Sequence, residues 1–100
     1  MADHPAPLSP VAARALIDRL LEQLDTISFT AHCRAQSHKR RFDTSDIRRV
    51  LEQGLPTADS WNEKHQNWTY RLAGYDYDGE SLTLVVVLEQ DVIKIVTGYD

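Results

Sequence analysis

The sequence holds little of what several protein classes need. Its one cysteine, Cys33, excludes an intramolecular disulfide framework and a metal site built from cysteines alone. No apolar run approaches the roughly 18 residues of a membrane-spanning helix, and the first residues have neither the basic start nor the apolar stretch of a secretory signal. We therefore expect a cytoplasmic protein with no membrane partner.

The chain does have enough apolar residues for a small core. Leu, Ile, Val and Phe make up 25 of the 100 residues, which exceeds the roughly 20% below which chains tend to stay disordered. The length is that of one domain. Because Pro5 and Pro7 lie before any apolar periodicity begins, we expect residues 1–8 to be disordered and residues 9–100 to form a single domain.

The first expected element is an amphipathic helix. Ser9 followed by Pro10 is typical of a helix start, and apolar residues recur at helical spacing over residues 10–25. Ile27 and Phe29 then alternate with small hydroxylated residues, which favours a short extended segment.

Two further helices are expected before the strands. One covers residues 31–41, and the other follows a cap at Asp43. We expect Gly54 to end the latter helix in the left-handed conformation, with Leu55 folding back on Val50.

Three strands are expected after a polar link. Residues 68–72 alternate between apolar and polar side chains, residues 82–88 are apolar enough for a central strand, and residues 92–99 make the last strand. Helices followed by strands indicate an α+β fold. We expect the N-terminal helices to pack on one face of a small antiparallel β-meander.

Asp78-Gly79 predicts the turn between the first two of these strands. A two-residue turn there would place Tyr70 opposite Val87. Because side chains alternate along a strand, Tyr70 and Leu72 share one face and Arg71 lies on the other. We expect Tyr70 and Leu72 to face the helices.

The charge is spread unevenly along the chain. The net charge is −4 overall, and by segment it is −2 over residues 1–25, +3 over residues 26–53 and −5 over residues 54–100. The basic middle segment is where a phosphate group would be attracted. A solvated helix face explains the same pattern without any ligand.

Positions spread over residues 29–99 resemble a known family. They are Thr30-Ala31-His32, Arg40, Asp46-Ile47, Gly54, Tyr70-Arg71-Leu72, Asp78-Gly79 and Ile95 to Tyr99. The pattern resembles the family called domain of unknown function 4258. The resemblance implies a RelE-like fold, the α+β scaffold of many toxin ribonucleases, similar in element order to the MqsR-type toxins. It also implies RNA and an antitoxin-like protein as partners.

These residues suggest a chemistry for RNA cleavage, which needs a base, an acid and cations at the phosphate. On a helix over residues 31–41, His32 and Arg40 project from one face, and an imidazole exchanges protons near neutral pH. The candidate catalytic residues are His32, Arg40 and Tyr99, and the candidate phosphate-binding residues are Lys39, Arg41 and Arg71.

Three interpretations of function stay open. The chain is a toxin-type or degenerate ribonuclease, or a non-catalytic module that binds protein or nucleic acid, or a domain that forms a homodimer or binds an antitoxin through its first helix. The acidic total charge weighs against the first. His32 could equally cap or pack at its helix start. Too few potential ligands converge for zinc, so we expect no metal and no cofactor.

Overall fold

The computed structural model describes residues 5–23, 25–31 and 44–99. Its elements are, in chain order, α1 (Pro10–Leu21), β1 (Ile27–Phe29), α3 (Thr44–Gln53), β2 (Thr57–Asn62), β3 (Asn67–Tyr75), β4 (Ser81–Leu88) and β5 (Ile93–Tyr99). The predicted α+β class is confirmed. The predicted helix over residues 31–41 and the predicted cap at Asp43 lie outside the described residues.

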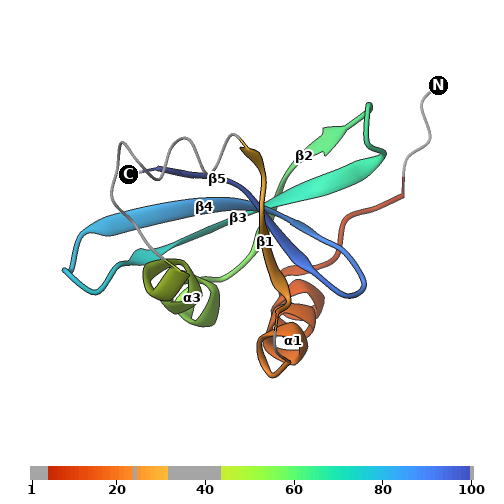
Figure 1. Cartoon of the computed structure of the whole chain (residues 1–100). Helices are drawn as coiled ribbons and strands as arrows, with labels where there is room; N and C mark the ends of the chain where they lie inside the picture. Colours follow the sequence, from red (N-terminus) through yellow and green to blue (C-terminus); the bar gives the residue numbers. More distant parts are fainter. Residues whose placement is uncertain (1–4, 24, 32–43, 100) are drawn as a thin grey trace.

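The strands form one mixed sheet of five strands in the order β1-β5-β4-β3-β2 (Figure 1). Strands β2 to β5 form an antiparallel meander, and β1 pairs with β5 in parallel. The expected three-stranded antiparallel sheet is therefore wrong in its strand number and in its purely antiparallel pairing. β2 was missed because its first four residues are exposed and show no apolar alternation. The central position predicted for β4 is confirmed.

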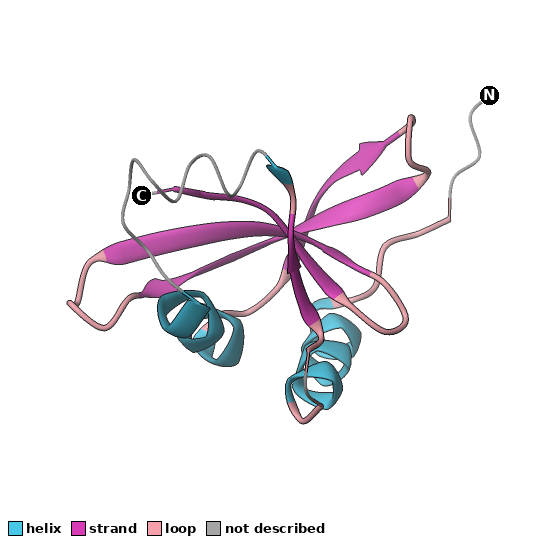
Figure 2. Ribbon diagram, in the orientation of Figure 1, coloured by secondary structure: helices cyan, strands magenta, loops and turns pink. Residues whose placement is uncertain are grey.

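Both described helices cover the same face of the sheet (Figures 1 and 2). The core between them and the sheet is closed by apolar side chains that are all less than 2% exposed, among them Ile17, Leu20, Ile47, Leu51, Leu72, Leu84 and Ile95. The predicted packing of the helices on one face is confirmed for the two described helices. Tyr70 and Leu72 face the helices, as their alternation with Arg71 predicted.

Helix α1 starts where the sequence predicted and ends earlier. The Ser9 hydroxyl accepts a hydrogen bond from the Ala12 amide at 3.1 Å. The helix ends at Leu21 rather than at residue 25, because the Thr26 hydroxyl donates to the Leu20 carbonyl at 2.7 Å and Asp25 reverses the chain with a φ of 58°.

The apolar stripe of α1 is used inside the domain. Ala13, Ile17 and Leu20 are 0% exposed, and Leu21 is 7% exposed. This stripe was the basis for a homodimer or antitoxin contact through the first helix. Because the sheet and α3 cover these four side chains, a contact of that kind would have to use other residues of α1, such as Val11, which is 78% exposed.

Gly54 has a different role from the one predicted. Its φ is not positive, whereas that of Gly79 is 82°. A Cβ at Gly54 would lie 2.9 Å from the Leu72 Cβ and 3.1 Å from the Val50 carbonyl oxygen. Glycine is therefore needed for the close approach of the end of α3 to β3. Leu55 is 61% exposed rather than folded back, and the buried residue that follows is Pro56.

The β3–β4 hairpin has a longer turn than predicted. The last pair before the turn is Tyr75 with Ser81, and Tyr70 lies opposite Val86 rather than Val87. The loop over residues 76–80 is closed by two backbone hydrogen bonds, from Asp76 N to Glu80 O at 2.9 Å and from Gly79 N to Asp76 O at 3.1 Å. Because the loop is longer than the assumed two residues, the register shifts by one residue.

The N-terminal residues that precede α1 lie along β3. The Trp68 indole donates to the Pro5 carbonyl at 2.7 Å, and the Leu8 amide donates to the Tyr70 hydroxyl at 2.9 Å. Trp68 also meets Trp61 edge to face, with ring centroids 5.8 Å apart. Within the part of the stretch 1–8 that the structure describes, Pro5 to Leu8 are thus tied to the sheet.

Candidate functional site

The face of the sheet opposite to α1 and α3, here called the distal face, carries the described candidate residues. Strand pairing arranges its side chains in three rows: Thr69–Val87–Lys94, Arg71–Val85–Thr97 and Ala73–Thr83–Tyr99. Arg71 and Tyr99 therefore point to the same side. They are two strands and one row apart, which corresponds to about 12 Å between their Cα atoms.

The other predicted site residues are His32, Lys39, Arg40 and Arg41. All four lie outside the described residues, so their joint placement stays a prediction. Thr30, two positions before His32 in the sequence, lines the cavity described below.

Arg71 is held by an ion pair within the sheet. Its guanidinium lies 2.8 Å from the Asp59 carboxylate, and the two side chains are 50% and 27% exposed. Asp59 lies where the β2–β3 register shifts, between Ala58 and Ser60. A phosphate that binds Arg71 would compete with this carboxylate, and a half-exposed pair of this kind contributes little stability.

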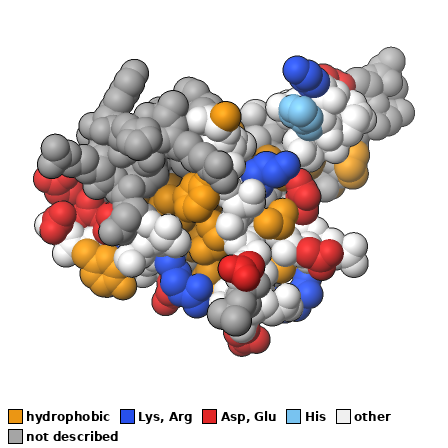
Figure 3. Space-filling model, viewed as in Figure 1, with side chains coloured by type: hydrophobic (Ala, Val, Ile, Leu, Met, Phe, Trp, Pro, Cys, Tyr) orange, Lys and Arg blue, Asp and Glu red, His pale blue; other side chains and the backbone are white. Residues whose placement is uncertain are grey.

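A cavity of about 530 Å³ opens on the distal face beside the Arg71 row. Its walls come from the residue after β1, from β2, β3 and the turn between them, and from β4, β5 and the turn between them; they include Thr30, His65, Asn67, Thr69, Glu89 and Lys94. Figure 3 shows cationic and histidine side chains close together over the β2–β3 end. The cavity thus gathers hydroxyl, amide, imidazole, carboxylate and ammonium groups.

His65 is positioned by the short turn between β2 and β3. Its backbone amide donates to the Asn62 Oδ1 at 3.0 Å, and the Gln66 amide side chain donates to the Glu63 carbonyl at 2.8 Å. Gln66 completes the reversal with a φ of 53°. The sequence suggested a loose polar link here, so His65 was not among the predicted site residues; Asn62 followed three residues later by His65 was the available turn signal.

Glu89 and Lys94 form the charged wall of the cavity. Lys94 Nζ lies 3.2 Å from Glu89 Oε1. The Lys94 side chain is 41% exposed and the Glu89 side chain 47%. The turn between β4 and β5 places them together, since the Glu89 amide donates to the Val92 carbonyl at 2.9 Å. A cation and a carboxylate here offer a donor and an acceptor side by side.

Asn67 contributes a buried acceptor. Its Oδ1 is shielded from solvent and has no hydrogen-bond partner among the described residues. Buried polar atoms are normally paired. Because less than 1 Å² of this oxygen is accessible, it lies behind the cavity surface, and a ligand reaches it only if the Asn67 side chain shifts.

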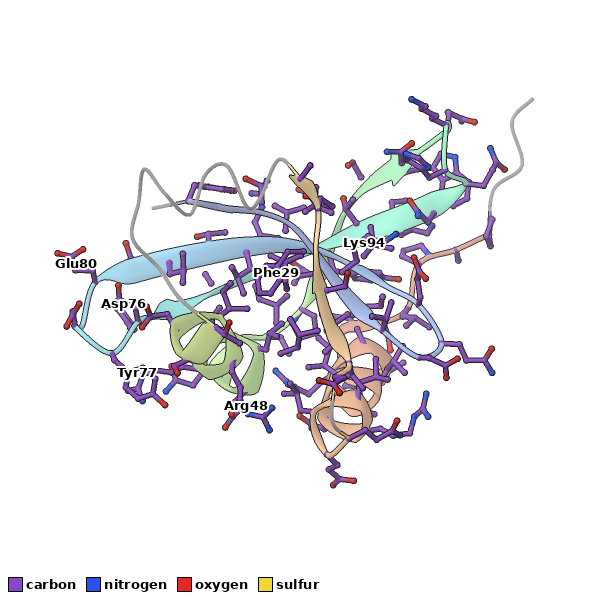
Figure 4. All side chains as sticks on the ribbon, viewed as in Figure 1. Phe29, Arg48, Asp76, Tyr77, Glu80 and Lys94 are labelled. Atoms are coloured by element: carbon purple, nitrogen blue, oxygen red, sulfur yellow. The ribbon has the colours of Figure 1, made fainter. Side chains whose placement is uncertain are left out.

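The β3–β4 loop forms a separate acidic end of the molecule. Asp76, Tyr77 and Glu80 lie at the end of the sheet away from Lys94 (Figure 4). The Tyr77 amide donates to the Asp46 carboxylate at 3.1 Å, and the Arg49 guanidinium lies 4.9 Å from the centre of the Tyr77 ring. These contacts fasten the loop to α3 and keep its charge away from the cavity.

Residues 5–23, 25–31 and 44–99 show neither a candidate metal site nor a candidate membrane-spanning helix. Within these ranges, no group of three or more His, Cys, Asp or Glu side chains could hold a metal ion. None of the helices there is long and apolar enough to cross a membrane.

The architecture is that of a small α+β domain in which the two described helices lie on one face of a mixed sheet and a polar cavity lies on the other. Residues 29–100 match the family model described as "Domain of unknown function (DUF4258)", and the chain belongs to this family. The predicted resemblance to that family is confirmed, and α1 precedes the matched region. No curated protein and no solved structure matches the chain.

Proposed function

We propose that this chain is a RelE-like domain that binds single-stranded RNA across the distal face of its sheet and cleaves it by acid–base chemistry. The observation that carries the proposal is the shared direction of Arg71, Lys94 and Tyr99, with the cavity between strands β1 and β3 on the same face. The order of helices and strands supports the RelE-like assignment.

The distal face has the groups that bind a nucleic-acid backbone. Arg71 offers a planar fork of donors that matches a phosphate. Lys94 adds a second cation one row away, and the Tyr99 hydroxyl, on a side chain that is 38% exposed, offers a donor at the far row. RNA of a few nucleotides would pass over all three rows, so the three groups bind successive nucleotides rather than one phosphate.

The cleavage step is assigned to His32 and Arg40. The 2′-hydroxyl loses its proton to a base, its oxygen attacks phosphorus, the bond from phosphorus to the 5′-oxygen breaks, and an acid protonates that leaving oxygen. His32 acts as the base or the acid, and Arg40 stabilises the charged phosphorane. The products are a 2′,3′-cyclic phosphate and a 5′-hydroxyl.

Binding is tested with the full chain and a fluorescent single-stranded RNA over a series of salt concentrations. We expect Arg71→Met to weaken binding several-fold and to reduce the salt slope by about one unit. Arg19→Met removes the same charge from α1 on the opposite face and should change neither value. RNA binding that is absent at low salt, or equal losses in the two variants, would refute the distal face as the binding surface.

Cleavage is tested by incubating labelled RNA with the purified chain and identifying the product ends. We expect His32→Ala to slow cleavage at least about 100-fold while RNA affinity stays within twofold. His4→Ala removes an imidazole that has no assigned role and serves as the matched control. RNA that stays intact with the unmodified chain would refute the cleavage step but not the binding step.

A further inference from the structure

We propose that the distal-face cavity is a subsite for one guanine base of the bound RNA. This inference rests on the proposed RNA binding and adds the class of nucleotide that the surface selects. It follows from the arrangement of donors and acceptors in the cavity wall, and none of the predicted catalytic residues is needed for it.

The cavity has the size of a small-ligand site. Its volume of about 530 Å³ lies within the roughly 300–1,000 Å³ that is usual for pockets that hold small molecules. The apolar residues in the lining are the buried Val87, which lies opposite Lys94 in the sheet, and the half-buried Val96. The Thr30 hydroxyl donates to the Val96 carbonyl at 3.0 Å.

The Glu89 carboxylate calls for N–H donors on the ligand. It lines the cavity and is 47% exposed, and its two oxygens have lone pairs beyond the one that faces Lys94. A ligand that presents two N–H groups on one edge would satisfy both oxygens.

The Lys94 ammonium adds a donor beside these acceptors, 3.2 Å from Glu89. The Watson–Crick edge of guanine carries the acceptor O6 next to the donors N1–H and N2–H₂. O6 therefore suits Lys94, as in the common pairing of lysine with guanine, and the two donors suit the two oxygens of Glu89. Adenine places an amino group where guanine has O6, so it would face Lys94 with a donor. Uracil lacks the second donor for the Glu89 carboxylate.

The cavity is also within reach of RNA held at Arg71. Thr69, in the cavity wall, lies two residues from Arg71 on the same face of β3, a step of roughly 7 Å. A strand whose phosphate contacts Arg71 can therefore place an adjacent base in the cavity. Bases of single-stranded RNA are free to turn out of the stack and to be recognised on this edge.

The test compares the affinities of short uridine-rich RNAs that carry one central G, A, U or inosine. We expect the RNA with guanine to bind about tenfold more tightly than those with adenine or uracil. Inosine, which lacks the N2 amino group, should fall between. Glu89→Gln should abolish the preference for guanine, while affinity for RNA without guanine stays equal or rises because Lys94 loses its partner.

Asp91→Asn is the matched control, since it removes the same charge from the same turn and Asp91 does not line the cavity. We expect it to keep the preference for guanine. Equal affinities for all four RNAs, or loss of the preference in both variants, would overturn the guanine subsite and leave RNA binding intact.

A titration with free nucleotides separates this inference from the proposed function. In heteronuclear NMR spectra, GMP should shift the backbone signals of Thr69, Val87 and Lys94, and AMP should not. Such shifts would support the subsite even if longer RNA failed to bind. GMP and AMP producing the same shifts, or none, would overturn it.

Discussion

On the helix-covered side of the molecule, Arg14 and Arg48 bind backbone carbonyls in addition to carboxylates, whereas on the distal face Arg71 and Lys94 are held by carboxylates. The Arg14 guanidinium donates to the carbonyls of Leu51 and Gly54, and Arg48 donates to the carbonyl of Leu21 at 2.9 Å. These carbonyls belong to the C-terminal ends of α3 and α1, where the helices leave acceptors without partners. These hydrogen bonds stabilise the helix ends, and we therefore regard these arginines as structural.

The distal face holds its cations in exchangeable pairs. Arg71 with Asp59 and Lys94 with Glu89 are half exposed, and pairs of this kind contribute about 0–1 kcal/mol. A phosphate or a base can take the place of either carboxylate at small cost. The difference teaches that a bond to a helix-end carbonyl, rather than charge or an ion pair, separates structural from functional candidates in this domain.

The largest expected effect is on the free energy of unfolding, and it compares two neighbouring residues of β3. Leu72→Ala removes a fully buried side chain beneath the helices and should lower the free energy of unfolding by about 3 kcal/mol. Arg71→Ala, one residue earlier on the distal face, should lower it by less than about 0.5 kcal/mol. Urea denaturation of both variants checks this. Similar losses would mean that the distal face is part of the stability core.

The second, smaller effect is also on stability, and it compares Gly54 with Gly79. Gly54→Ala forces a methyl group against the Leu72 Cβ and the Val50 carbonyl and should cost about 2 kcal/mol. Gly79→Ala meets no neighbouring atom within 4 Å and should cost about 1 kcal/mol, from its positive φ alone. Thermal unfolding ranks the two. The reverse order would refute the close approach between α3 and β3.

A third effect tests the arginine that closes α3. Arg14→Met keeps much of the apolar stem and removes the donors to the two helix-end carbonyls, so it should cost about 1.5 kcal/mol. Asp18→Asn, which removes only the exposed ion pair of Arg14, should cost less than about 0.5 kcal/mol. Chemical denaturation of both variants measures these losses. A larger loss of stability in Asp18→Asn than in Arg14→Met would contradict the structural role of Arg14.

The sequence was most informative where a local pattern determines the structure. Helical spacing and the Ser9 cap predicted α1, the apolar run over residues 82–88 predicted the central strand, and alternation assigned Tyr70 and Arg71 to opposite faces. Each of these depends on residues that are near one another in the chain.

The features that escaped prediction depend on contacts between distant segments. The exposed strand β2 shows no apolar alternation, and the need for glycine at position 54 arises only once Leu72 lies against it. The cavity unites His65 from a turn with Glu89 and Lys94 from another turn and strand. No spacing pattern in the sequence predicts that these side chains line one cavity.

The smallest expected effect is on RNA affinity, and it tests the ion pair between Arg71 and Asp59. Asp59→Asn removes the carboxylate that competes with phosphate for Arg71, so RNA should bind about threefold more tightly, in keeping with the small free energy of an exposed pair. Glu63→Gln removes the same charge from an exposed position in the β2–β3 turn and corrects for the change in net charge.

The decisive comparison is the double variant Asp59→Asn with Arg71→Met. If Asp59 acts by occupying Arg71, the gain from Asp59→Asn should vanish once the guanidinium is gone, because the two changes are then coupled rather than additive. Fluorescence titration of the four proteins at one salt concentration measures this coupling. A gain that persists without Arg71 would show that Asp59 only repels RNA through its charge, and Arg71 would then lose its place as the phosphate-binding residue of the distal face.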